Sequence, residues 1–162
     1  MQVHAVIQPA ISLAPPIYLP QPSPNGLSAE AALLLHEARN AVFDEVAKGR
    51  IGHGLQLLGQ ALELKPMNHD LLCDMAALKL ATGDLTGAAE FAHQALAVQP
   101  KHGVSLYTLG FALSGQGEIK QAQAVLGDLM QDEEALDSLL QEAPGLLSVI
   151  RTEIARMHRL TR

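Results

Sequence analysis

His69 and Cys73 are the residues of this sequence whose types and spacing are best suited to chemistry, since they lie four positions apart. On a helix this spacing places an imidazole and a thiol on one face, where both could bind a metal ion, with Asp70 and Asp74 beside them. A closed zinc site needs four ligands, however, and the chain has no CxxC or HxxxH motif to complete one. We therefore predict neither a metal site nor a cofactor, and expect His69 to begin a helix and Cys73 to be a packed thiol.

The helix that would carry these side chains belongs to a pattern that recurs every 34 residues. Gly49, Gly83 and Gly117 lie one period apart, and after one intervening residue each is followed by an aliphatic residue and, three positions further on, by a small residue. These followers are Ile51, Leu85 and Ile119, and then Gly54, Ala88 and Ala122. Glycine permits a positive φ at a turn, and small residues let two helices approach closely. Because one helical hairpin cannot bury its apolar face alone, the period predicts an array of stacked hairpins.

This pattern resembles the tetratricopeptide repeat, in which small residues, a glycine and a proline recur at fixed positions of a helix–turn–helix unit. The unit that starts at His69 carries the accepted residue types at seven positions: Leu72, Met75, Ala76, Gly83, Ala88, Ala95 and Pro100. The unit from Gly103 fits nearly as well, although Leu129 and Glu134 replace a small residue and the proline. The unit from Leu35 is degenerate in its first helix. The resemblance implies an all-α solenoid with three repeats, at residues 35–68, 69–102 and 103–134.

Segments on both sides complete the predicted domain. Ser28 can cap a helix that reaches about Lys48, so the repeat region is expected to span residues 28–134. By the repeat phase, the following helices are predicted at residues 51–64, 69–81, 85–98, 103–115 and 118–130. Residues 135–162 contain two further amphipathic segments separated by Pro144, and we predict that they cap the array, because terminal units need a polar outer face.

In the repeat family, the concave face is lined by fixed positions of each first helix. Carried onto this sequence, those positions include seven residues that we predict bind a peptide: Phe43, Val46, Cys73, Ala77, Leu80, Tyr107 and Phe111. Phe43, Tyr107 and Phe111 are three of only five aromatic residues in the chain, and aromatic side chains commonly anchor binding hot spots. The alternative is that these rings fill gaps between repeats. A mostly apolar face favours an extended, proline-containing peptide over a terminal carboxylate.

Composition excludes several other classes of protein. A net charge of −6, with 11 Lys and Arg residues that do not cluster inside the repeats, argues against nucleic-acid binding. The single cysteine cannot form an internal disulfide and suits a reducing, cytoplasmic compartment. No segment approaches the ~18 apolar residues of a membrane span, and no secretory signal is recognised. Nucleophile motifs and phosphate-binding glycine loops are also missing, so the protein is not expected to be an enzyme.

Residues 1–27 hold six of the nine prolines and no Asp, Glu, Lys or Arg, which predicts an extended, proline-rich arm. The helix that follows is apolar around its whole circumference at residues 31–35, so it is expected to be covered. Cover by the arm and cover by a second chain, in a homodimer, both remain open.

Size, acidity, three repeats and one apolar groove together resemble the translocator chaperones of bacterial type III secretion. The resemblance implies a partner held through a Pro-x-Leu-x-x-Pro stretch in the groove. Pro15, Ile17 and Pro20 match that stretch with isoleucine for leucine, so the arm is predicted to be a pseudo-ligand for this groove or a neighbour's; a disordered tail is the alternative. A general adaptor for assembling a larger protein complex is the alternative function, and an enzyme is a remote third.

Overall fold

The computed structural model describes residues 29–162, which form eight α-helices and no β-strand. In chain order these are α1 (Ala29–Ala47), α2 (Ile51–Leu64), α3 (His69–Ala81), α4 (Leu85–Val98), α5 (Gly103–Gly115), α6 (Ile119–Gln131), α7 (Glu133–Glu142) and α8 (Leu146–Leu160). None of these eight helices is long and apolar enough to cross a membrane. The predicted all-α class is confirmed for this part of the chain, and the bounds of α2 to α6 agree with the predicted ranges to within one residue.

The chain divides into two units, Met1–His36 and Glu37–Arg162. The first unit contains the predicted proline-rich arm, with Pro15, Ile17 and Pro20, which lies outside the described residues. Its described part is the beginning of α1, where the side chains of Leu33 and Leu34 are exposed. The cover expected for this apolar helix start, by the arm or by a second chain, stays a prediction.

Each helical hairpin turns at a glycine with a positive φ: Gly49 between α1 and α2 (+77°), Gly83 between α3 and α4 (+80°) and Gly117 between α5 and α6 (+84°). This backbone conformation is strained for any residue with a Cβ, so the spacing of the three glycines determines where the hairpins turn. The structure thus confirms the role predicted for the repeating glycines.

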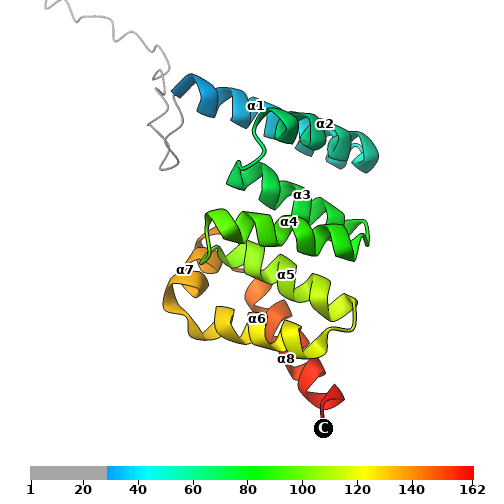
Figure 1. The fold of residues 1–162 in the computed structure, drawn as a ribbon, viewed down its shortest axis with the longest axis vertical. Coiled ribbons are helices and arrows are strands. Elements are labelled where there is room, and N and C mark those ends of the chain that lie inside the picture. Colours follow the sequence, from blue (N-terminus) through cyan, green and yellow to red (C-terminus); the bar gives the residue numbers. More distant parts are fainter. Residues whose placement is uncertain (1–28) are drawn as a thin grey trace, which may run out of the picture. The chain divides into compact units, whose positions relative to one another are not determined.

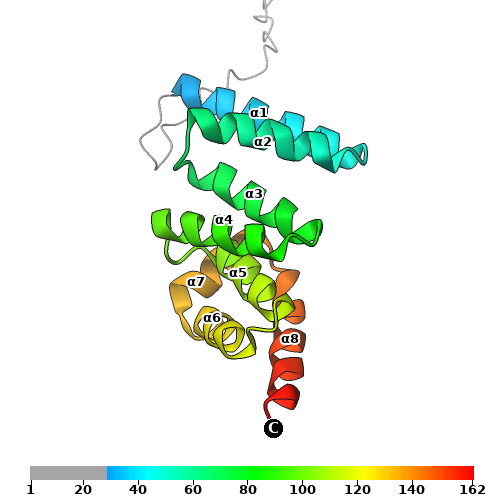
Figure 2. The ribbon, with the colours of Figure 1, turned by 45° about the vertical axis from the view of Figure 1, so that its right-hand side comes forward.

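Helices α3 to α6 stack in order, as Figures 1 and 2 show from two directions. Helix α4 packs against both α3 and α5, and α5 also packs against α3, so the second and third hairpins share one interior. Its centre consists of small and branched side chains that are fully or almost fully buried: Ala76, Ala88, Ala92, Ala112, Ala122, Leu126 and Leu129. Stacking therefore supplies the apolar burial that a single hairpin lacks.

Two glycines permit the closest helix approaches in this core. A Cβ at Gly110 of α5 would lie 2.3 Å from Leu126 Cδ2 of α6. A Cβ at Gly103 would lie 2.5 Å from the backbone nitrogen of Leu139 and 2.6 Å from the carbonyl oxygen of Ala135. The second contact involves backbone atoms of α7, which cannot rotate away as a side chain can, so α7 lies against the start of α5 only because residue 103 has no side chain.

Helices α7 and α8 cover the end of the third hairpin. Leu139 of α7 and Ile150 and Met157 of α8 are fully buried and belong to the same core cluster as the repeats. On the first helix of the hairpin, the buried Ser114 hydroxyl donates to Glu153 Oε1 of α8 and accepts from Arg156 Nη2, 2.8 Å away. Helices α7 and α8 thus cover both apolar and polar side chains at the end of the third hairpin, as a cap would.

Candidate functional site

The first helices of the three hairpins, α1, α3 and α5, carry the residues predicted to bind a peptide. We call the set Arg39, Phe43, Val46, Asp70, Cys73, Ala77, Leu80, Tyr107 and Phe111 the first-helix face. In the described part of the chain, its members range from exposed (Phe43 and Ala77) to half-buried (Val46, Cys73, Leu80, Tyr107 and Phe111). None is fully buried, so all of them retain surface that a ligand could contact.

Tyr107 and Phe111 form the aromatic centre of this face. They lie one turn apart on α5, their ring centroids are 4.5 Å apart, and their planes are inclined by 37°. Both rings pack on one side against the buried core of the repeats and are partly exposed on the other. Such a pair is a rigid apolar platform, since the core contact fixes its rotamers.

Phe43 lies in a different environment from these two rings. Its side chain is 49% exposed, and the Arg39 guanidinium carbon lies 6.0 Å from its ring centroid. At this distance the cation is at the limit of a favourable interaction with the ring face. The prediction that Phe43 joins Tyr107 and Phe111 in one binding surface remains a prediction.

Charge on this face is greater than the sequence analysis expected. Arg39 of α1 donates from Nε and Nη2 to Asp74 of α3, at 2.5 and 3.0 Å, and its Nη1 lies 3.4 Å from Asp70 Oδ2. The hydrogen bond to Asp74 is the main cause that raises the pKa of Arg39 above its ordinary value, against the opposing effect of burial. The first-helix face therefore carries ion-paired side chains on α1 and α3, beside Phe43, in addition to the Tyr107–Phe111 pair on α5.

Val46, Ala77 and Leu80 are the smaller members of the predicted set. Val46 packs so closely on α2 that a Cβ at Gly54 would lie 3.0 Å from Val46 Cγ2. Leu80 packs against the core, and Ala77 is exposed. Val46 and Leu80 thus contribute to packing as well as to the face.

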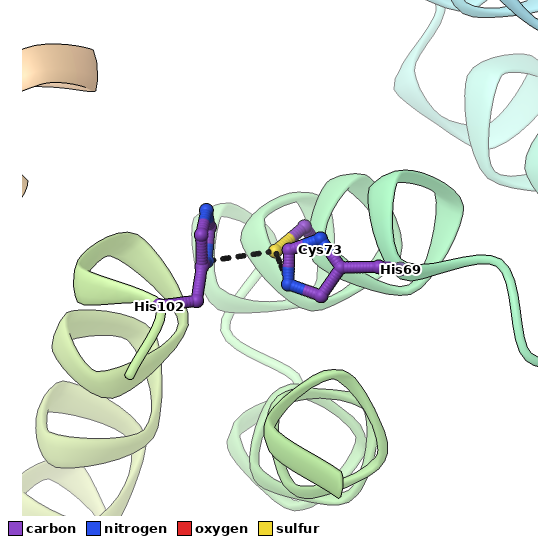
Figure 3. Close-up of side chains that lie close together, drawn as sticks. All are labelled: His69, Cys73 and His102. Carbon is purple, nitrogen blue, oxygen red and sulfur yellow. Dashed lines mark hydrogen bonds between the residues drawn. The ribbon is translucent and has the colours of Figure 1, made fainter. Parts of the chain in front are cut away.

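Cys73, the remaining member of that set, lies in a compact polar cluster shown in Figure 3. Its Sγ is 3.8 Å from His69 Nε2, 3.4 Å from His102 Nδ1 and 2.8 Å from Ser105 Oγ. His69, His102 and Ser105 are buried, at 3%, 8% and 1% exposure. Helix α3 supplies His69 and Cys73, whereas α5 supplies Ser105 and is capped by His102, so the cluster joins the second and third repeats.

His102 takes part in this cluster because it ends one repeat and begins the next. As the N-cap of α5, its Nδ1 accepts a hydrogen bond from the Ser105 backbone N–H at 3.2 Å. Its other nitrogen, Nε2, lies 2.8 Å from Glu142 Oε1 of α7. A carboxylate can only accept, so Nε2 is the donor in the contact with Glu142.

Burial and hydrogen bonds act in opposite directions on the ionisable groups of the cluster. Burial alone would raise the pKa of the Cys73 thiol, but hydrogen bonds with His102, His69 and Ser105 lower it to about 7. Burial likewise opposes the charged form of His69, yet the neighbouring Asp70 carboxylate and Cys73 thiol raise its pKa to about 9. Cys73 is therefore more acidic than an ordinary thiol, and thiolate is the nucleophilic and metal-binding form of cysteine.

Comparison with known proteins gives the architecture a name. Residues 79–147 match the family model described as tetratricopeptide repeat. Among solved structures, the Sgt2 TPR domain from Aspergillus fumigatus matches with a TM-score of 0.62 at 23% sequence identity, over 78% of each chain. The fold is a tetratricopeptide repeat solenoid. A comparison with curated protein sequences finds no match.

Three cluster residues were missed by sequence reasoning, which counted only His69 and Cys73 as ligands at this point. The structure adds His102, Ser105 and Glu142 from α5 and α7. A sequence signal for His102 existed, because His69 and His102 are 33 residues apart, almost one repeat period. In a tetratricopeptide repeat solenoid, residues one period apart are stacked neighbours, so ligands can be contributed by equivalent places in successive repeats.

Proposed function

We propose that this protein is a non-catalytic interaction module that binds an extended apolar peptide of a partner protein on its first-helix face. The observation that carries the proposal is the Tyr107–Phe111 pair, whose rings contact each other, pack against the core and are still partly exposed. Solenoids made of tetratricopeptide repeats present such extended surfaces for ligands.

The energetics of this surface suit a reversible complex. Burial of three aromatic side chains, Phe43, Tyr107 and Phe111, contributes on the order of 4–8 kcal/mol before the costs of association are counted. Ordering an extended peptide and losing its free rotation offset most of that gain. We therefore expect micromolar affinity, with Tyr107 and Phe111 contributing more than Phe43, because the core already holds their rings in place.

Electrostatics of the first-helix face favour an apolar ligand over a terminal carboxylate. Arg39 is the cation of this face, and its guanidinium is already bound by Asp74 and Asp70. A carboxylate ligand would have to displace one of these aspartates and would meet the negative charge of both. An apolar segment with prolines, which exposes few unpaired N–H groups, meets no such penalty.

The finer form of the proposal is a chaperone of the type III secretion kind, acting in the cytoplasm, which keeps a hydrophobic export substrate from aggregating. The alternative is an adaptor that joins two proteins of a larger assembly. Co-expression with the partner distinguishes the two: a chaperone's partner precipitates when the chaperone is omitted, whereas an adaptor's partner stays in solution alone.

A peptide-binding measurement tests the proposal directly. The probe is a fluorescent peptide with the sequence of residues 13–22 and leucine at the position of Ile17, titrated with the full chain and followed by anisotropy. We expect Phe111→Ala to weaken binding at least tenfold. The matched control is Phe91→Ala, which removes a half-buried aromatic from α4, outside the first-helix face. Equal losses for the two variants, or no binding by the wild type, would contradict the proposal.

A further inference from the structure

We propose that His69, Cys73 and His102 form a binding site for one divalent transition-metal ion of the zinc type. Their ligand atoms all lie within 4.8 Å of one another, on α3 and at the start of α5. Two imidazoles and one thiolate are donor groups that zinc binds in proteins. This inference is independent of the peptide-binding function.

The distances between donor atoms fit a tetrahedral ion. With Zn–N bonds of about 2.05 Å and a Zn–S bond of about 2.3 Å, a tetrahedral angle places nitrogen and sulfur about 3.6 Å apart. Here Sγ of Cys73 lies 3.4 Å from His102 Nδ1 and 3.8 Å from His69 Nε2. Two edges of the coordination polyhedron are therefore present to within a few tenths of an ångström. The third edge, between the two rings, is at most 4.8 Å long and must shorten to about 3.4 Å.

The outward-facing ring nitrogens are placed as they are in known metal sites. Histidines that bind metal donate their other N–H to a carboxylate or carbonyl, which fixes the tautomer and orients the ring. His102 Nε2 lies 2.8 Å from Glu142 Oε1, and His69 Nδ1 lies 3.5 Å from Asp70 Oδ1. Both rings thus direct one nitrogen at a carboxylate and the other at Cys73.

His69 also carries an unsatisfied polar atom. Its Nδ1 makes no hydrogen bond, and the whole residue is only 3% exposed. Buried polar atoms without a partner are rare in native structures, and this one belongs to the ring whose other nitrogen faces Cys73.

Ser105 is the residue that must rearrange. Its hydroxyl lies 2.8 Å from both Cys73 Sγ and His102 Nδ1, on the edge between two ligands. An ion on that edge requires the Ser105 hydroxyl to turn to another rotamer. The ion also takes the lone pair of His102 Nδ1, which in this structure accepts the hydrogen bond from the Ser105 N–H that caps α5. Ion binding therefore removes one N-cap hydrogen bond of α5. Three protein ligands leave the fourth position to water, as in zinc sites with an open coordination position.

Direct titration of the full chain tests the site. We use Zn²⁺ by calorimetry and Co²⁺ as the spectroscopic probe, because thiolate bonded to cobalt gives a charge-transfer absorption that histidine alone does not. We expect one ion per chain with that absorption, and at least tenfold slower alkylation of Cys73 when Zn²⁺ is bound. The chain has a single cysteine, so labelling reports on this thiol only.

Four variants distinguish the built site from metal held by surface histidines. Cys73→Ser should abolish the charge-transfer absorption and weaken Zn²⁺ binding at least tenfold, and Glu142→Gln should weaken it about tenfold by loosening His102. Ser105→Ala retains all three ligands and removes the obstructing hydroxyl, so affinity should be unchanged or tighter. The matched control, His93→Gln, removes an exposed histidine of α4 and should change nothing.

Two results would overturn the inference. One is that the wild-type chain binds no Zn²⁺ at micromolar concentration. The other is that it binds the ion equally well with Cys73 replaced and with His93 replaced. Circular dichroism of each variant accompanies the titrations and shows whether it folds. If Cys73→Ser fails to fold, Ser105→Ala keeps the test decisive, because the cobalt spectrum of Ser105→Ala must show the thiolate band.

Discussion

The junction between the second and third hairpins differs in kind from the junction between the first and second. The former lies inside one continuous apolar cluster that extends from Ala76 to Met157, and it also contains the buried His69 and His102 with the half-buried Cys73 between them. The latter is bridged by the half-buried Arg39–Asp74 pair, and the linker from α2 to α3 is flanked by strongly exposed side chains, Leu64 at 81% and Met67 at 58%.

This difference shows that equal sequence periods do not produce equal coupling. In a solenoid, stability is approximately a sum of repeat and interface contributions, so a weaker interface lets the terminal unit open on its own. The buried hydrophobic residues of the first hairpin, Val42 and Leu58, are not part of the large cluster, and neither are the buried Leu71, Leu72 and Met75 of α3. We expect α1 and α2 to exchange with solvent before α3 to α8 do.

The largest effects are expected from truncating one fully buried leucine in the large cluster and one in the first hairpin. Leu126 and Leu58 are both 0% exposed, the former in the large cluster and the latter in the first hairpin. We expect Leu126→Ala to cost about 3 kcal/mol of global stability in urea unfolding. Leu58→Ala should instead accelerate hydrogen exchange in α1 and α2 and leave protection of α5 and α6 unchanged. If both variants lowered protection throughout the chain alike, the two junctions would be equivalent.

A glycine substitution tests how tightly the capped end is packed. Gly103→Ala should destabilise the protein by about 2 kcal/mol, because its Cβ meets backbone atoms of Leu139 and Ala135. Gly127→Ala in α6 is the control, since nothing lies within 4 Å of the added Cβ; there we expect stabilisation of about 0.5–1 kcal/mol. Thermal unfolding of both variants measures the contrast, which would be absent if α7 packed loosely.

Removal of the Arg39–Asp74 ion pair, which bridges the first and second hairpins, should have a smaller effect on stability. Arg39→Ala leaves Asp74, whose side chain is 11% exposed, without its bidentate partner, and we expect a loss of about 1–2 kcal/mol. Arg50→Ala is the matched control, because Arg50 makes a similar bidentate pair with Glu45, whose side chain is 13% exposed, but Arg50 itself is 53% exposed against 30% for Arg39. It should cause no measurable loss in the same urea titration. Equal effects would mean that burial does not strengthen the Arg39 pair.

The smallest expected effect is a pH dependence at the first hairpin. Hydrogen bonds from Arg50 and His53 hold the pKa of Glu45 at about 2, below its ordinary value of 4.5. Because the folded-state pKa is depressed, the stability that Glu45 contributes is fully present above pH 4.5 and is lost as the pH falls toward 2. The wild type should therefore be slightly more stable than Glu45→Gln at pH 6, and the difference should vanish near pH 2. A difference that persisted at low pH would assign the effect to packing.

Much of the fold was predictable because it depends on short-range rules. Glycine at Gly49, Gly83 and Gly117 determines the turns, and the 34-residue period places the helices to within a residue. The polar contacts were not predictable in the same way. Arg39, for example, pairs with Asp74, which is 35 residues away in the sequence. Such pairings depend on side-chain rotamers and on the rotation of one helix against the next, which no local pattern encodes.

Helices α7 and α8 also bear on how copies of this protein can associate. Stacked repeats are complementary from head to tail, and heterologous contacts of that kind build either closed rings or open filaments. Here the surface on which a fourth hairpin would stack is occupied, because Leu139, Ile150 and Met157 are buried in it and Ser114 is bonded to Glu153 and Arg156. A second copy that stacked on the C-terminal end of the array would therefore first have to displace α7 and α8.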